Sequence, residues 1–206
     1  KILPDGQLTG IYRSGNHFKI YWEGKRSDSI ELKSLGDPLG LTIMNNDEVF
    51  KLALSDTKGN RIDISQGTFA GKPKILQIMG TWCPNCKDET AFLLGYLKDN
   101  PDPGFEILGV SFERHTDTTK AIAAIETYKT KMQIPYPIVY GGTNDKKKAG
   151  EVFPMLNKVV AYPTLIFLDK YNKVVAIHTG FSGPATSGYA AFKEEFSALV
   201  TKMKSR

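Results

Sequence analysis

The alternation of apolar and polar positions predicts an α/β chain from about residue 48 onward. Short apolar runs suited to buried strands alternate with longer segments whose apolar residues recur three or four positions apart, as on one helix face. The clearest strand runs from Lys74 to Met79, and a helix is expected directly after Gly80. The other expected elements are a leading hairpin at 50–54 and 61–64, strands at 105–111 and 137–140, helices at 117–132 and 145–156, a hairpin at 164–168 and 174–178, and a last helix from about 189. This order predicts a mixed sheet with helices on both faces.

The first 47 residues follow a different pattern. Leu8 to Tyr12 and Phe18 to Trp22 are aromatic and β-branched runs separated by turn-forming residues, and Ile30 to Leu32 is a candidate third strand. Three short strands bury little surface by themselves. We therefore expect residues 1–47 to be a β-rich extension, either the end of an upstream domain or a packing extension of the domain at 48–206.

Composition and charge narrow the possible functions. The 206 residues are 41% hydrophobic and 24% charged, which is ordinary for a globular protein and excludes disordered, collagen-like and coiled-coil classes. The net charge of +5 is spread along the chain, so we expect no nucleic-acid partner. The longest apolar run, at 159–168, is too short to span a membrane.

Two cysteines, Cys83 and Cys86, are the most informative residues of the sequence. A structural disulfide framework needs more cysteines at longer spacings. A zinc site usually needs four ligands, and the three histidines are isolated from the pair and from one another, so we expect no metal. A pair three positions apart is better explained by redox chemistry than by an incidental buried pair.

The position of this pair, between a strand and a helix, favours a reactive thiol. Pro84 suits a first helical turn, so Cys83 lies where unpaired N–H groups and the helix dipole stabilise a thiolate. Cys86 falls one turn into the helix, within reach of the first sulfur but more buried. We expect Cys83 to attack a disulfide and Cys86 to resolve the mixed disulfide, with no cofactor.

The segment Gly80-Thr81-Trp82-Cys83-Pro84-Asn85-Cys86, with Tyr162-Pro163-Thr164 opening a later hairpin, resembles the thioredoxin superfamily. It resembles most the TlpA- and ResA-type thiol-disulfide oxidoreductases, which are grouped with the AhpC/TSA redoxins. The resemblance implies a thioredoxin-like three-layer α/β sandwich over 48–206. It also implies a cis Pro163, where the alternative is a trans proline, and substrate contacts from Trp82, Pro84, Tyr162 and Pro163.

Three positions bear on the details of this resemblance. Gln77 stands where thioredoxins keep a buried Asp, and Gln cannot accept a proton. Glu89 stands where ResA-type proteins carry a Glu, which implies a catalytic role in proton transfer; the alternative is a favourable charge in the first helical turn. The dipeptide Pro84-Asn85 replaces the Glu-Pro common in ResA-type sites, which leaves the direction of electron flow open.

The resemblance implies an enzyme that reduces or exchanges disulfides in exported proteins, apocytochrome c among them. Its partners would be disulfide-containing proteins and an upstream membrane or envelope thiol reductant, and we expect a monomer. Residues 5–10 and 14–17 also resemble the end of the β-rich domain in longer Bacteroidetes-type envelope proteins. That likeness implies a periplasmic or envelope location and a complete protein with a signal sequence or lipid anchor.

Three alternatives stand beside this function: a second enzymatic activity, a non-catalytic module and a metallochaperone. A thiol peroxidase with an antioxidant role would carry a Thr three residues before the cysteine, where this chain has Gly80. A non-catalytic module would bind exposed chains with incidental cysteines. Copper-handling relatives usually pair Cys-x-x-x-Cys with a distant His, which this spacing does not match.

Overall fold

The computed structural model describes residues 2–14, 18–25 and 36–206, which belong to two compact units, Lys1–Leu35 and Gly36–Arg206. In the first unit, β1 (Gln7–Ser14) pairs antiparallel with β2 (Phe18–Lys25), as the sequence predicts. The candidate strand at 30–32 lies outside the described residues. The domain boundary expected near residue 47 stays a prediction.

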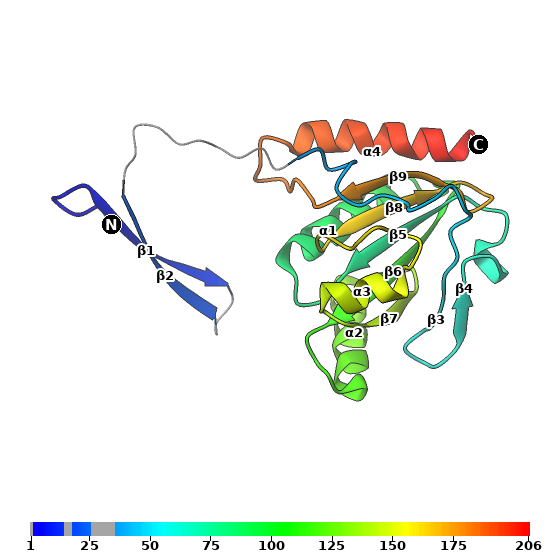
Figure 1. Ribbon diagram of the computed structural model, residues 1–206, viewed down its shortest axis with the longest axis horizontal. Coiled ribbons are helices and arrows are strands. Elements are labelled where there is room, and N and C mark those ends of the chain that lie inside the picture. Colours follow the sequence, from blue (N-terminus) through cyan, green and yellow to red (C-terminus); the bar gives the residue numbers. More distant parts are fainter. Residues whose placement is uncertain (1, 15–17, 26–35) are drawn as a thin grey trace. The chain divides into compact units, whose positions relative to one another are not determined.

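The second unit is built on a five-stranded mixed sheet with the order β7-β6-β5-β8-β9 (Figure 1). The strands are β5 (Lys74–Met79), β6 (Glu106–Glu113), β7 (Ile138–Thr143), β8 (Thr164–Leu168) and β9 (Val174–Thr179). Strand β5 runs parallel to β6 and antiparallel to β8, and all six of its residues are buried. A strand covered on both faces reads as a continuous apolar run, which explains its clear signal in the sequence.

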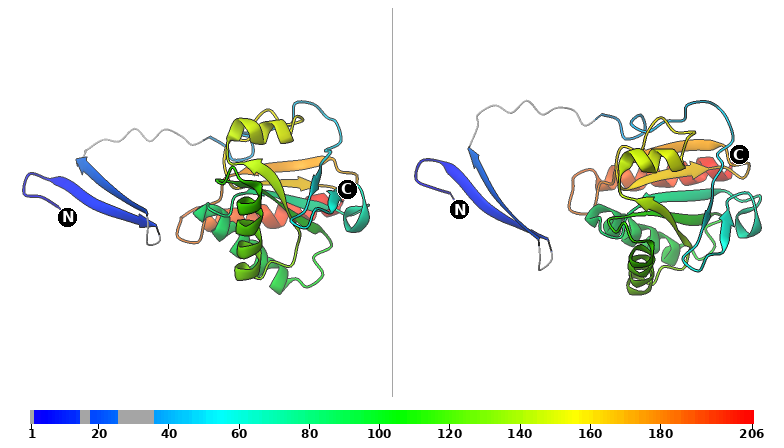
Figure 2. Two further views of the ribbon diagram at one scale, coloured as in Figure 1. Left: turned by 90° about the horizontal axis from the view of Figure 1, so that it is seen from below. Right: turned by 60° about the horizontal axis from the view of Figure 1, so that its bottom comes forward.

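Helices cover both faces of this sheet (Figure 2). They are α1 (Pro84–Asp99), α2 (Thr118–Met132), α3 (Lys146–Val152) and α4 (Tyr189–Lys204). Side chains of α1, α2 and α4 join one apolar core, and those of α3 and residues 50–69 join the other. The second group includes the small hairpin of β3 (Ala53–Ser55) and β4 (Arg61–Asp63), followed by a 3-10 turn at Gly67–Phe69. The structure therefore has the three layers expected from the sequence.

Helix α3 is shorter than the sequence pattern predicts. It ends at Val152, although apolar residues continue to Leu156. Pro154 disfavours helical geometry at the residue before it, and Phe153 turns into the core instead. Across the described residues, none of the helices is long and apolar enough to cross a bilayer.

Candidate functional site

The two cysteines lie at the edge of the sheet where the loops that follow β5 and β6 meet. Strands β5 and β6 are parallel, so their carboxyl ends, and the loops that follow, meet at the same edge. Cys83 caps α1 with extended backbone, and its Sγ accepts a hydrogen bond from the backbone N–H of Cys86 at 3.4 Å. Pro84 occupies the first helical position, as expected, and is exposed. Both cysteines are buried free thiols.

The two thiols are chemically unequal. A hydrogen bond from the Cys86 thiol, aided by backbone N–H groups of Asn85 and Cys86 and by the charge of Arg114, lowers the pKa of Cys83 to about 7. Burial raises the pKa of the Cys86 thiol, and the neighbouring Cys83 raises it further. Near neutral pH Cys83 is therefore substantially a thiolate, whereas Cys86 stays protonated.

Two aromatic residues and a cis proline lie near the Cys83 thiol. The Tyr162–Pro163 peptide bond is cis, and the Tyr162 carbonyl oxygen lies 3.5 Å from Cys83 Sγ. The Tyr162 ring meets the Trp82 ring edge-on with 5.9 Å between centroids. Trp82 is fixed in turn by its Nε1–H, which donates to the Phe112 carbonyl at 2.8 Å. Of the four expected substrate-binding residues, the structure thus brings the Tyr162 carbonyl to the thiol, with the Trp82 ring against Tyr162 and the cis Pro163 next in the chain.

Glu89 does not lie in the first turn of α1, where the alternative interpretation of the sequence placed it. The first turn of α1 holds no acidic residue, and Glu89 is fully buried on the inner helix face with Cys86 and Leu93. The alternative interpretation of Glu89 as a favourable charge in the first helical turn is therefore wrong. Burial raises the pKa of the Glu89 carboxyl well above its usual value, and the charge on Cys83 adds to the effect.

A buried polar cluster beneath the cysteines was not predicted from the sequence. Gln77 on β5 donates from Nε2 to Glu89 Oε2 at 2.9 Å, and its Oε1 accepts from the Tyr136 hydroxyl at 3.3 Å. Thr90 also hydrogen-bonds the Gln77 amide. Glu89 Oε1 has no hydrogen-bond partner among the described residues. The helical spacing of Cys86, Glu89 and Leu93 was the available signal, because it puts the carboxyl on the buried face.

A carboxylate that the sequence did not single out, Glu113, holds the loop that leads into Cys83. Glu113 is buried and accepts hydrogen bonds from the Thr81 backbone N at 3.0 Å, the Thr81 hydroxyl at 2.7 Å and the Ser111 hydroxyl at 2.6 Å. The next residue, Arg114, places its guanidinium 4.5 Å from the centre of the Trp82 ring, a cation–π contact. Nothing in the sequence pattern distinguished these two charges from surface residues.

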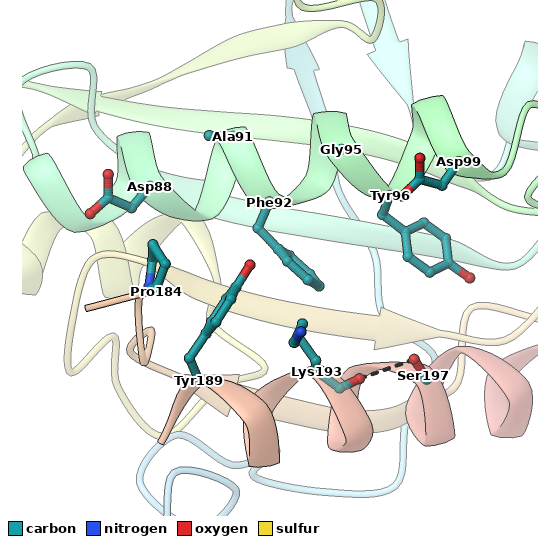
Figure 3. Close-up of a pocket in the computed structure, with 10 residues that line it drawn as sticks. All are labelled: Asp88, Ala91, Phe92, Gly95, Tyr96, Asp99, Pro184, Tyr189, Lys193 and Ser197. Carbon is teal, nitrogen blue, oxygen red and sulfur yellow. Dashed lines mark hydrogen bonds between the residues drawn. The ribbon is translucent and has the colours of Figure 1, made fainter. Parts of the chain in front are cut away.

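A groove of the second unit has neither thiol in its lining. Between α1 and α4, a groove of about 500 Å³ is lined by Phe92 and Tyr189, with the carboxylates of Asp88 and Asp99 along the α1 side (Figure 3). Neither cysteine lines it. No cluster of three or more His, Cys, Asp or Glu side chains suited to a metal occurs in the described ranges 2–14, 18–25 and 36–206.

The chain is similar to curated thiol-disulfide oxidoreductases. It is 26% identical over 139 residues to the thiol-disulfide oxidoreductase ResA of Bacillus subtilis, which covers 68% of this chain and 69% of that protein. It is 27% identical over 127 residues to ResA of Geobacillus kaustophilus, covering 62% of this chain and 64% of that protein. These relatives support the protein-disulfide oxidoreductase activity expected from the cysteine pair.

Solved structures confirm the thioredoxin-like fold. A thiol-disulfide oxidoreductase from Bacteroides fragilis superposes with a TM-score of 0.52 at 22% identity, over 70% of this chain and 96% of that one. The thioredoxin domain of a Bacteroides vulgatus thiol-disulfide oxidoreductase gives 0.53 at 22% identity, over 75% and 99%. The model of the AhpC/TSA family matches residues 46–177, more than half of the sequence and the whole segment that carries the cysteine pair. The chain therefore belongs to the AhpC/TSA family, within which its similarities are to the thiol-disulfide oxidoreductases.

Proposed function

We propose that this protein reduces disulfides in exported proteins through a mixed disulfide at Cys83. The observation that carries the proposal is the inequality of the two thiols: Cys83 caps α1 with a lowered pKa, whereas Cys86 is buried one turn further along with a raised pKa. Only the Cys83 thiol has the lowered pKa that favours attack on a substrate disulfide. Only the Cys86 thiol is placed to attack Cys83 afterwards.

The proposed cycle balances in two steps. The Cys83 thiolate attacks one sulfur of a substrate disulfide, a bond forms between Cys83 and that sulfur, and the other substrate sulfur leaves as a thiolate. Cys86 then loses its proton and attacks Cys83 Sγ, which forms the Cys83–Cys86 disulfide and releases the second substrate sulfur. The substrate gains two electrons, and an upstream dithiol reductant must return two electrons to the pair.

The second step needs a group that takes the Cys86 proton, and we assign Glu89 to this role. Its carboxyl is buried beside the pair, and its Oε1 has no hydrogen-bond partner among the described residues. Burial raises its pKa, so the carboxylate, once ionised, is a stronger base for that proton than an exposed one. Gln77 holds the other oxygen at 2.9 Å and so orients the carboxyl. In this proposal, Glu89 on the helix replaces the carboxylate that thioredoxins carry on the strand.

The proposed substrates, location and electron donor follow from the same family resemblance. The substrates are exported cysteine proteins, with apocytochrome c as one candidate, and the site of action is the periplasm or cell envelope. Trp82, Tyr162 and the cis Pro163 border the thiol and would contact the substrate chain. The protein would act as a monomer and receive electrons from an envelope thiol reductant.

Trapping tests this function directly. In Cys86→Ser the first step remains and the second is blocked, so a peptide disulfide should leave a stable adduct on Cys83 that mass spectrometry detects. The control Cys83→Ser should form none. Equal adduct formation on both variants, or none on either, would refute the proposed order of attack.

The direction of electron flow is tested by titration against glutathione or dithiothreitol buffers. A reductase should show a two-electron transition at roughly −250 mV or below, in the range of thioredoxin. A transition near about −120 mV would instead indicate an oxidant of exported proteins.

A further inference from the structure

A second groove, on the α2 side of the site, begins at the loop that leads into Cys83. It is shallow, with a volume of about 430 Å³. Thr81 forms one end, two residues before the nucleophile, and one face of α2 forms the floor. The lining residues are Thr81, His115, Lys120, Ala123, Ala124, Thr127, Tyr128 and Lys131.

The charge of this groove has one sign. Lys120 and Lys131 are exposed cations, and its lining includes no carboxylate. Arg114 adds a third cation at the border with the Trp82 ring, and it forms no ion pair with any residue that the structure describes. Of the nearby acids, Glu113 is buried and accepts hydrogen bonds from Thr81 and Ser111. Asp117 caps the start of α2, and Glu126 hydrogen-bonds Thr57. Lys120, Lys131 and Arg114 therefore have no ion-pair partner among the residues that the structure describes.

The dimensions suit an extended peptide. Lys120 and Lys131 are eleven residues apart on one helix, which corresponds to about 16 Å. An extended chain covers that length in about five residues. The groove between α1 and α4 is lined by Asp88 and Asp99 together with Lys193, so it carries charges of both signs.

We propose that the α2 groove binds an acidic segment of the substrate protein next to the cysteine that Cys83 attacks. This inference rests on the proposed function and adds a substrate class to it: disulfides flanked on one side by Asp or Glu. Exposed complementary charges mainly speed association and lose their effect as salt screens them. The groove should thus act on the second-order rate constant at low ionic strength.

The test is single-turnover reduction of disulfide-linked fluorescent peptides by the pre-reduced protein. Four peptides share one core and differ in flanks: neutral, three Glu before the cysteine, three Glu after it, and three Lys. We expect one of the Glu peptides to react about tenfold faster than the neutral peptide at low salt, with the advantage lost at about 0.5 M NaCl.

Charge reversal locates the effect. Lys120→Glu with Lys131→Glu should abolish the advantage of that Glu peptide and favour the Lys peptide. The matched control is Lys193→Glu with Lys202→Glu on α4, which makes the same change in net charge beside β8 and β9, at the other end of the sheet. All four lysines are exposed, and the control variant additionally removes the cation–π contact of Lys193 with the Tyr189 ring, 5.1 Å from its centre.

Each outcome bears on the proposal. The two Glu peptides could react at equal rates, or both double variants could lose the advantage equally. Either result would indicate attraction by the overall charge and overturn the proposal that the α2 groove binds an acidic segment. If the neutral peptide is reduced but charge makes no difference, the groove proposal fails and the reductase proposal stands. If no peptide is reduced, the reductase proposal itself fails.

Discussion

The side-chain amide of Gln77 donates a hydrogen bond of 2.9 Å to the Glu89 carboxylate, and this bond joins the central strand to the inner face of α1 beneath the two thiols. Both residues are fully buried. A buried carboxyl with one oxygen unpartnered among the described residues is costly to ionise, and this one lies close enough to Cys83 for the thiol's charge to raise its pKa.

The raised pKa of Glu89 predicts how stability depends on pH. The folded protein holds this proton at pH values where the unfolded chain, with a pKa near the ordinary 4.5, has released it. Stability should therefore fall as pH rises above about 4.5, and Glu89→Gln should remove this contribution. Urea unfolding of the reduced proteins from about pH 4 to 8 measures it. Parallel stability curves for the two proteins would contradict the assignment.

The lowered pKa of Cys83 predicts the pH dependence of its reactivity. Alkylation of the reduced protein should rise about tenfold per pH unit below pH 7, then level off above a midpoint of about 7. Cys86→Ala removes the thiol hydrogen bond that is the largest cause of the shift, so the midpoint should move upward. Mass spectrometry of the alkylated protein should find the label on Cys83 first. A midpoint unchanged by Cys86→Ala would show that the helix end alone sets the pKa.

Glu113→Ala tests the anchor of the loop before Cys83. It leaves the Thr81 N–H and the hydroxyls of Thr81 and Ser111 without their acceptor, which should cost about 1–3 kcal/mol of unfolding free energy. Glu113→Gln keeps one acceptor oxygen and should cost less. Urea unfolding measures both, and Glu194→Ala on the exposed face of α4 is the control. A loss in the control equal to that in Glu113→Ala would rule out a specific anchor.

Phe196 joins α4 to the sheet and to α1. The centre of its ring lies 4.9 Å from the ring centre of Phe92, 5.1 Å from that of Tyr96 and 5.7 Å from that of Phe167. The residue is 1% exposed. Phe196→Ala should therefore lower the unfolding free energy by about 3–5 kcal/mol through lost burial and the cavity left behind. Tyr171→Ala, at a side chain 63% exposed, should change it by less than about 0.5 kcal/mol. Calorimetry of both variants compares the two positions.

Local pattern was sufficient for most elements of the fold. Strand β5 has the bounds that its apolar run predicts, and α1 begins at Pro84 because a proline suits the first helical position. The exception, α3, shows where periodicity misleads: apolar residues continue past Val152, but Pro154 ends the helix and Phe153 packs in the core without it.

The sequence by itself determined where the candidate chemistry lies, because Cys83 and Cys86 are its two cysteines and stand at a spacing that has few other uses. Only the tertiary structure decided what surrounds them. Glu113 reaches Thr81 across 32 positions of chain, Gln77 reaches Glu89 from another element, and Arg114 meets Trp82 because two parallel strands end at one edge. Such contacts depend on how strands and helices pack, and no local periodicity records them.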